Sequence, residues 1–416
     1  MAAVLQVGSN KTGLSFNQTL YCVCGNGHAV MREVEAQTQV TYRTAGILSN
    51  LWVRVSLNLI LDGASTIRVR KNGANGNQVV SFAASTTGTA EDTTNTDSVA
   101  AGDELNYSVV IGGTTGNFFP RLLNILFAAS SDTVIRHTAM GINSLVVAST
   151  TVYIPLAGDS ISTVGEGLAT FDVNSAGTLK NLFVYIYSNA RTTTTTFRSR
   201  VNGANGNLAV SVGSTQTGIF EDTANSDTLA ANDDVNYSVT TGTGTEAIYW
   251  TVVSTELLTT NKKFHSIAGD LSGAAGSGQV ANLTRYYHLG GVFAVIISES
   301  FFSSAELNID ATASNLYIHV QINTVTAAST FDLRKNAAST AVTISIPALT
   351  AGSFEDATNT VGLVPTDAVN YRLVTGATGT SMTFRMMGSM LENTTVTAAV
   401  GPLVSPVLMG LSVGVV

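Results

Sequence analysis

The chain has 416 residues, of which 44% are hydrophobic and only 12% are charged, about half the charged share of an ordinary globular protein. Its length suggests about three domains of roughly 150 residues each, and its hydrophobic content argues against a disordered chain. A net charge of −8, with only 20 scattered lysines and arginines, disfavours nucleic acid as a partner, because phosphate binding requires clustered basic residues.

The start of the chain shows no targeting signal. Residues 1–8 contain no basic segment followed by an apolar core, so we expect no secretory signal peptide and synthesis in the cytoplasm. No apolar run approaches the roughly 20 residues of a membrane-spanning helix. Two cysteines, Cys22 and Cys24, are too few for a disulfide scaffold, so packing must hold the fold together.

One stretch occurs three times and organises the chain. Residues 91–97 return as residues 221–227 and 355–360, at spacings of 130 and 134, and each copy begins with Glu-Asp. Each is followed by a strand-like segment that ends in Asn-Tyr, at Tyr107, Tyr237 and Tyr371. A match that keeps both halves nearly in register indicates an internal repeat of about 130 residues.

Other columns extend the repeat over almost the whole period. Three arginines, Arg70, Arg200 and Arg334, share one column, and Asn-Leu-aromatic segments begin at residues 50, 181 and 315. The domains therefore abut with little linker. We predict boundaries that give domains 1–141, 142–272 and 273–400, followed by an apolar tail, 401–416.

Within a copy the hydrophobic period is two, as in strands with one buried face. In the first copy, residues 51–57 and 66–70 alternate, an Asn-Gly turn follows at residues 72–73, and strands follow over 79–82, 105–111 and 122–128. In the third copy Ala337 replaces the turn glycine, so that turn is expected to differ. No segment has helical periodicity. The prediction is an all-β chain of three tandem antiparallel, jelly-roll-like β-sandwiches, arranged as a pseudo-threefold cluster or as a row.

The acidic loop is the candidate metal site. Carboxylate and amide oxygens suit Ca²⁺, and the candidate ligands are Glu91, Asp92, Asn95 and Asp97 in copy one and Glu221, Asp222, Asn225 and Asp227 in copy two. The spacing does not fit an EF-hand loop, and Val361 replaces the last aspartate in copy three. The favoured interpretation is therefore a turn in which these side chains accept backbone N–H bonds, with no bound metal.

The recurring arginines suggest a structural clamp. We expect Arg70, Arg200 and Arg334 to pair with the loop carboxylates Asp92, Asp222 and Asp356 and hold the loop in place. This pairing requires no ligand.

No catalytic set is evident. The sequence contains no phosphate-binding loop, and its one Gly-x-Ser-x-Gly match, residues 410–414, is followed by only two residues, too few for the helix that a nucleophile elbow needs. We therefore expect no enzyme activity and no cofactor.

The end of the chain is apolar and has no counterpart after the first two copies. Residues 401–416 contain no charge, and an exposed segment of this kind would aggregate. It is either a last strand of the third domain or a strand docked on a neighbouring subunit. The residues expected to mediate assembly are Leu403, Val404, Val407, Leu408 and Leu411.

Two resemblances follow from these motifs. The Gly-Asp-Glu-Leu of residues 102–105, opening a late strand of an all-β unit, resembles the globular heads of the C1q and tumour-necrosis-factor type, which implies a compact trimer that three copies in one chain could mimic. Asn232 and Thr366 replace the glycine in the other copies and weaken this match. The Asn-Gly hairpin, the Glu-Asp loop and the Asn-Tyr strand together also resemble repeat units in phage and bacterial surface proteins.

The leading hypothesis is a virion structural protein, a capsid decoration (cement) protein or a surface appendage of a tailed phage, made in the host cytoplasm and located at the virion surface. Its expected partners are the major capsid protein or copies of itself, as an oligomer. The alternative is an extracellular bacterial fibre or adhesin subunit that assembles by strand donation. A glycan-binding sandwich is a third alternative, for which Trp52 and Trp250 are the available tryptophan platforms.

Overall fold

The computed structural model describes residues 3–10, 13–28, 30–130, 133–145, 147–159, 162–259, 262–269, 278–290, 299, 305–307 and 309–394. The assembly residues predicted within 401–416 lie outside these ranges. The described chain is built almost entirely of β-strands, with two short 3₁₀ helices, η1 (Glu35–Gln37) and η2 (Glu166–Leu168).

The first sandwich consists of two antiparallel sheets, with four principal strands in each. One sheet has the order β1 (Ala3–Ser9), β11 (Asn117–Ala129), β6 (Gly46–Asn58), β9 (Gly88–Val99). The other has the order β3 (Gln18–Val23), β10 (Glu104–Ile111), β7 (Ser65–Lys71), β8 (Ala74–Phe82). Short strands β2 (Leu14–Ser15) and β5 (Val40–Thr41) pair with β11 and β10. Apart from the β7–β8 hairpin, successive principal strands alternate between the two sheets, which is the pattern of a jelly roll.

The same topology recurs twice. In the second sandwich one sheet has the order β12 (Thr133–Leu145), β20 (Ile248–Thr259), β15 (Gly177–Asn189), β18 (Gly218–Leu229). The other has the order β13 (Thr151–Ile154), β19 (Asp233–Thr241), β16 (Thr195–Val201), β17 (Ala204–Val212), with β14 (Phe171–Val173) beside β19. In the third sandwich one sheet has the order β21 (Lys263–Gly269), β31 (Gly379–Asn393), β25 (Ala311–Val325), β28 (Gly352–Asp356). The other has the order β23 (Thr284–Tyr287), β30 (Ala368–Val374), β26 (Ser329–Lys335), β27 (Ala338–Ile346). The short strands β22 (Gly278–Val280), β24 (Ala305–Glu306) and β29 (Val361–Leu363) pair with β31, β30 and β25. The predicted fold, three tandem jelly-roll-like sandwiches, is confirmed.

The first strand of the second sandwich and that of the third both begin before the predicted domain boundaries. Strand β12 starts at Thr133 and pairs along its length with β20, the last long strand of the second sandwich. A boundary after residue 141 therefore cuts through this strand. Strand β21 likewise starts at Lys263, before residue 273, and pairs with β31 of the third sandwich.

Alternating burial follows the alternating sequence. On β7 the side chains of Ile67 and Val69 are fully buried, while Arg68 between them is partly exposed. The two-residue turn that follows places Asn72 and Gly73 at φ of 52° and 73°, as a type I′ hairpin requires.

The corresponding turn of the third sandwich keeps this geometry, contrary to the prediction. Asn336 and Ala337 have φ of 50° and 61°, and Lys335 pairs directly with Ala338 across the same two-residue loop. A left-handed alanine costs roughly 1–2 kcal/mol. The strand register on both sides fixes the loop length, so the packed strands impose the turn on an unfavourable residue.

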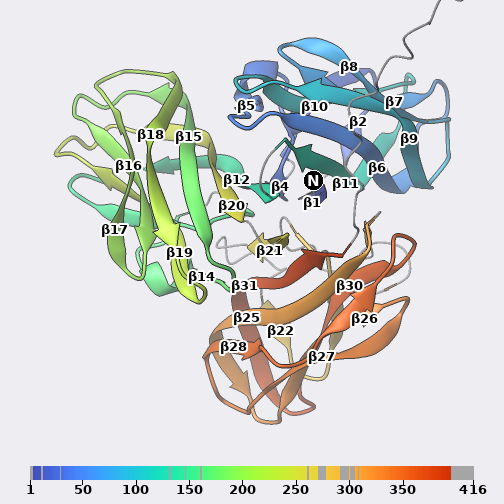
Figure 1. Ribbon diagram of the computed structural model, residues 1–416, viewed down its shortest axis with the longest axis vertical. Helices are drawn as coiled ribbons and strands as arrows, with labels where there is room; N and C mark the ends of the chain where they lie inside the picture. Colours follow the sequence, from blue (N-terminus) through green and yellow to red (C-terminus); the bar gives the residue numbers. More distant parts are fainter. Residues whose placement is uncertain are drawn as a thin grey trace, which may run out of the picture.

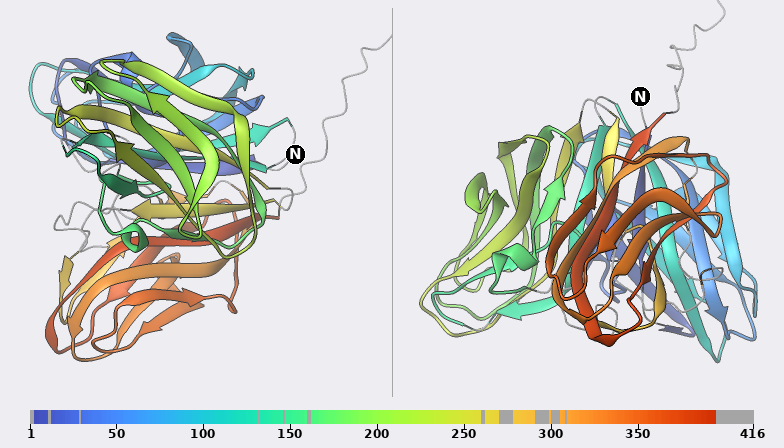
Figure 2. Two further views of the ribbon diagram at one scale, coloured as in Figure 1. Left: turned by 90° about the vertical axis from the view of Figure 1, so that its left-hand side faces the viewer. Right: turned by 90° about the horizontal axis from the view of Figure 1, so that it is seen from below.

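The three sandwiches surround a common centre rather than forming a row (Figure 1). The strands that open the repeats, β1, β12 and β21, lie on the inner side, and the views in Figure 2 show the sandwiches packed against one another. Strand β4 (Asn26–His28) pairs in parallel with both β1 and β12. The inner sheets of the first and second sandwiches are thereby joined into one ten-stranded sheet.

Candidate interfaces between the sandwiches

The aspartate of the repeated Glu-Asp motif organises a turn. One Asp92 oxygen accepts an N–H bond from Val79 of β8 at 2.9 Å, and the other accepts from the backbone of Thr94 and Asn95 at 3.2 and 3.0 Å. Asp222 and Asp356 make the same contacts in their sandwiches, including bonds of 2.9 Å from Ala209 and Thr343. The aspartate thus ties the loop to the neighbouring strand of the opposite sheet.

These contacts stabilise the ionised carboxylate. Burial on its own would raise the pKa of Asp92, but the hydrogen bonds from Asn95, Val79 and Thr94 outweigh it and bring the pKa down to about 2. The same balance lowers the pKa of Asp222 and of Asp356.

In the described part of the chain, the side-chain oxygens of the acidic loop do not form a set of calcium ligands. Asp97 accepts backbone bonds from Asn77 and Gln78 at 2.7 and 3.2 Å, and Asn95 directs its amide N–H groups at Asp92. No group of three or more His, Cys, Asp or Glu side chains among the described residues is placed to hold a metal ion. The oxygens of this loop are arranged around N–H donors instead.

The recurring arginines do not pair with the loop aspartates. Each presents Nε and Nη2 to both oxygens of one glutamate, at 2.8–2.9 Å: Arg70 to Glu35 in η1, Arg200 to Glu166 in η2 and Arg334 to Glu299. The same guanidinium groups also contact the Asn-Gly hairpin or its counterpart. The predicted clamp is therefore wrong in its partner, because the aspartates are already committed to backbone N–H groups. The glutamates recur at spacings of 131 and 133, and this signal could have identified them.

The glutamate of the Glu-Asp motif lies at the interfaces between sandwiches. Glu221 of the second sandwich forms an ion pair with Arg43 of the first. Glu355 of the third accepts a bond from Asn174 of the second, the residue at the position equivalent to Arg43. Each contact joins the loop near a short edge strand of one sandwich to the motif of the next.

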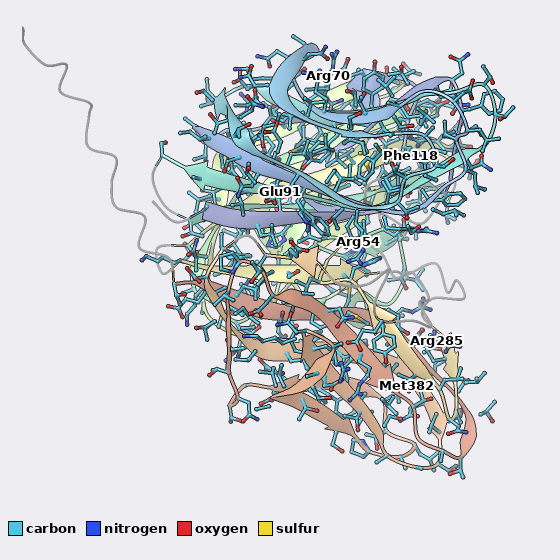
Figure 3. The ribbon with its side chains drawn as sticks, turned by 90° about the vertical axis from the view of Figure 1, so that its right-hand side faces the viewer. Arg54, Arg70, Glu91, Phe118, Arg285 and Met382 are labelled. Atoms are coloured by element: carbon cyan, nitrogen blue, oxygen red, sulfur yellow. The ribbon has the colours of Figure 1, made fainter. Side chains whose placement is uncertain are left out.

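The third interface places Glu91 of the first sandwich near Glu306 of the third. Burial and the Glu306 carboxylate raise the pKa of Glu91, and burial lowers the pKa of Arg54, an effect that Glu306 opposes. In Figure 3, Arg54 and Glu91 lie on the side of the first sandwich that faces the third, and Arg70 lies on the far side. The three interfaces therefore form a closed, head-to-tail ring.

The first interface is centred on a buried ion pair. Arg136 of β12 and Glu256 of β20 are almost fully buried and lie 2.7 Å apart. Glu256 also accepts bonds from the Arg43 N–H at 2.9 Å, from Thr44 at 3.1 Å and from Asn181 at 2.7 Å. Burial would raise the pKa of Glu256, but Arg136 and the hydrogen bonds from the Arg43 N–H and Asn181 hold it below its usual value. The carboxylate thus joins the two sandwiches.

The second interface is aromatic and acidic. The Phe171 ring of β14 meets the rings of His265 and Tyr317 edge-on, at centroid distances of 5.6 and 5.3 Å. A side chain at Gly388 of β31 would come within 2.9 Å of Phe171, so this approach requires a glycine. Beside it, Asp172 stands opposite Asp234 in the strand ladder, and Glu355 lies near Asp172.

The side-chain carboxyl group of Asp172 has a raised pKa. Burial raises the pKa of Asp172 to about 7, and the hydrogen bond that protonated Asp172 donates to Asp234, together with the charges of Asp234 and Glu355, acts in the same direction. Like charges directly opposite in a ladder are destabilising. A proton retained on Asp172 relieves that repulsion at this interface.

The two cysteines and the two tryptophans are buried. The cysteines Cys22 and Cys24 are free thiols in the core of the first sandwich. Trp52 and Trp250 are at most 1% exposed, so neither provides a surface platform for a sugar. No helix among the described residues is long and apolar enough to cross a membrane.

Comparison with known proteins adds little. No protein-family model matches the chain, and no curated protein matches it. One solved structure, from work on the triple jelly roll fold and turret assembly in an archaeal virus, is 12% identical over 93% of this chain and 91% of that chain, with a TM-score of 0.20. A TM-score this low establishes neither a fold nor a function for this chain.

We expect Asp92→Asn to lower the free energy of unfolding at pH 7 by about 1–3 kcal/mol, because the amide N–H₂ would face backbone donors. The folded pKa lies below the unfolded one, so the contribution is fully present above about pH 4 and is lost as the pH falls towards 2. The deficit of the variant, measured by denaturant unfolding, should shrink over that window. Glu33→Gln, at an exposed carboxylate, is the control; an equal deficit there would contradict the proposed role of the turn.

For the buried ion pair, we expect Glu256→Leu alone to cost about 3–5 kcal/mol, because it leaves the Arg136 charge buried without a partner. At the equivalent ladder position β1 and β11 pair Leu5 with Leu126. Combining Arg136→Leu with Glu256→Leu should therefore cost less than the two single changes together, by about 1–3 kcal/mol. Strictly additive costs in a double-mutant cycle would show that the pair is not coupled.

For Asp172, the folded pKa lies above the unfolded one, so the folded state holds an extra proton between about pH 4 and 7. This contribution to stability falls as the pH rises through that window. Asp172→Asn should remove the fall, so that the variant gains stability relative to the parent between pH 5 and pH 8 in thermal unfolding. A constant difference in stability between the two proteins across this range would contradict the retention of a proton on Asp172.

Proposed function

We propose that this chain is a non-enzymatic structural protein of a virion surface, either a capsid decoration (cement) protein or a surface appendage of a tailed phage. The observation that carries the proposal is the closed ring of three jelly rolls within one polypeptide. Its proposed partners are the major capsid protein or copies of itself.

The ring supports this role through its symmetry. Head-to-tail contacts that close after three units produce a compact block with pseudo-threefold symmetry. Such a block matches the threefold positions of a capsid shell, where three equivalent shell surfaces converge. Because the three units are covalently joined, one chain fills one position, and its assembly does not depend on the concentration of monomers.

The outer surface is compatible with a particle exterior. In the repeated motif the side chains of Thr93, Asn95 and Thr96 are exposed, and hydroxyl and amide side chains of this kind replace the usual surface charges. Neutral polar groups hydrate well without creating strong electrostatic attraction for other molecules.

The alternative, a fibre subunit that donates its C-terminal strand, depends on residues 401–416. These residues lie outside the described ranges, so the alternative remains a prediction from sequence.

The test is co-sedimentation of the purified chain with purified capsids, followed by cryo-electron microscopy. We expect saturable binding at one chain per threefold or local threefold position. A second protein that lacks residues 401–416 separates the two functions: it should still bind capsids in the decoration role, whereas loss of self-assembly would indicate the fibre role. Capsids that bind no chain at saturating concentration would refute the proposal.

A further inference from the structure

The second interface brings three carboxyl groups together without a paired cation. Asp172 of β14 stands opposite Asp234 of β19 in the ladder, and Glu355 of the third sandwich lies near Asp172 across the interface. Within the described ranges, none of the three belongs to an ion pair. Residues opposite each other in such a ladder have Cβ atoms roughly 4.5–5.5 Å apart, so two ionised carboxylates there repel each other.

The equivalent ladder positions of the other two sandwiches hold fewer acids. In the first sandwich Thr41 stands opposite Glu104, and in the third sandwich Glu306 stands opposite Ala368. Among these three positions, that of the second sandwich alone has an acid on both strands. The fold therefore does not require two facing acids at this place.

The second interface also lacks the arginine that compensates the first. At the first interface the motif glutamate, Glu221, pairs with Arg43. At the second interface the motif glutamate is Glu355, and the residue equivalent to Arg43 is the neutral Asn174, which donates its amide N–H to that carboxylate. The first interface thus balances its motif carboxylate with a cation, and the second does not.

The titratable rings around the carboxyl groups are neutral near pH 7. They come from β21 and β25 of the third sandwich and are the side chains of His265, Tyr317 and His319. Burial lowers the pKa of His265 to about 4 and lowers that of His319 from its ordinary value of 6.5. Burial raises the pKa of Tyr317. None of these rings supplies a positive charge while Asp172 loses its proton.

Two cations of the third sandwich lie near these rings and bind other groups. Lys263 of β21, near His265, has its Nζ atom 3.9 Å from the carboxylate of Glu392. Arg385 of β31, near His319, donates from Nε to the Gln321 side chain at 2.6 Å. Relief of the repulsion between the facing acids therefore depends on a proton.

Side chains hold the second interface together, and no strand ladder among the described residues crosses it. The Phe171 ring meets His265, the Asn174 backbone N–H donates to Nε2 of His265 at 3.0 Å, and the Asn174 amide binds Glu355. The first interface is joined in addition through the β4 ladder. Asp172 is partly exposed, so its proton can exchange with solvent while the interface is intact.

We propose that the second interface is a pH-dependent switch: a proton on Asp172 keeps the second and third sandwiches together, and loss of this proton lets them separate while the first interface stays closed. The switch is a property of the ring and does not depend on the proposed virion role.

The direction of the switch follows from linkage between proton binding and opening. In the closed interface the pKa of Asp172 is about 7, whereas a separated, hydrated aspartate has a pKa of about 4. The closed form therefore holds an extra proton between these values. Its advantage is fully present below about pH 4 and is lost as the pH rises to 7.

The test is single-molecule FRET on the full chain, with dyes at exposed, equivalent positions of the three hairpins: Ala74, Ala204 and Ala338. The double variant Ala204→Cys with Ala338→Cys reports on the second interface, and Ala74→Cys with Ala204→Cys reports on the first. Cys22 and Cys24 are buried, so the dyes attach at the introduced pair.

We expect the 204–338 pair to gain a second population of changed transfer efficiency as the pH rises. The ratio of open to closed molecules should increase about tenfold or more between pH 5 and pH 8, since one proton changes such a ratio by at most tenfold per pH unit. The 74–204 pair should keep a single efficiency over the same range, which also reports that the sandwiches remain folded.

Substitutions assign the effect to the facing acids. Asp172→Asn should hold the 204–338 ratio constant between pH 5 and pH 8, because the amide has no proton to release in this range. Asp234→Asn should shrink the pH response, because Asp172 then keeps only its burial and Glu355 as causes of proton retention. Glu104→Gln, at the position of the first sandwich equivalent to Asp234, is the matched control and should respond to pH as the parent does.

Three results would overturn the proposal. The first is a 204–338 ratio that does not change between pH 5 and pH 8. The second is an equal change at both labelled pairs, which would indicate general loosening of the ring. The third is an Asp172→Asn variant that keeps the pH response of the parent.

Discussion

The last long strand of each sandwich is buried on both faces, and the arrangement of the whole molecule follows from this. On β11, Leu123, Ile125 and Phe127 point into the core of the first sandwich, while Leu122 and Leu126 belong to the cluster shared with the other two sandwiches. A single sandwich would leave the second face in water. Covering about 100 Å² of apolar surface contributes roughly 2.5 kcal/mol, so three such faces favour meeting at a common centre over lying in a row.

Equivalent ladder positions on the inner sheets of the three sandwiches hold different residue types, and this difference specifies which sandwich packs against which. The ladder position occupied by Leu5 and Leu126 in the first sandwich holds Arg136 and Glu256 in the second and His265 and Met390 in the third. Three identical apolar faces would allow exchange between sandwiches of different chains. A buried charge placed at the wrong interface would lose its partner, so the ion pair discriminates between arrangements more than it adds stability.

Sequence reasoning recovered what is local and repeated. The strand alternation, the Asn-Gly turn and the threefold register depend on near neighbours in the chain, and all are visible in the spacing. The role of the motif glutamates was not visible, because Glu221 and Glu355 bind Arg43 and Asn174, residues of different types about 180 positions away in another repeat. At Ala337 a prediction from the local sequence was wrong, because the packed strands on both sides impose a left-handed conformation that alanine disfavours.

Strand β4 makes the ring mechanically unequal. Its parallel pairing with β1 and β12 carries backbone hydrogen bonds across the first interface, whereas no strand ladder in the described ranges joins the third sandwich to either of the others. A ladder breaks only when several bonds yield together, but side-chain contacts separate one at a time. We therefore expect a load applied across the block to separate the two interfaces of the third sandwich before it separates the first interface.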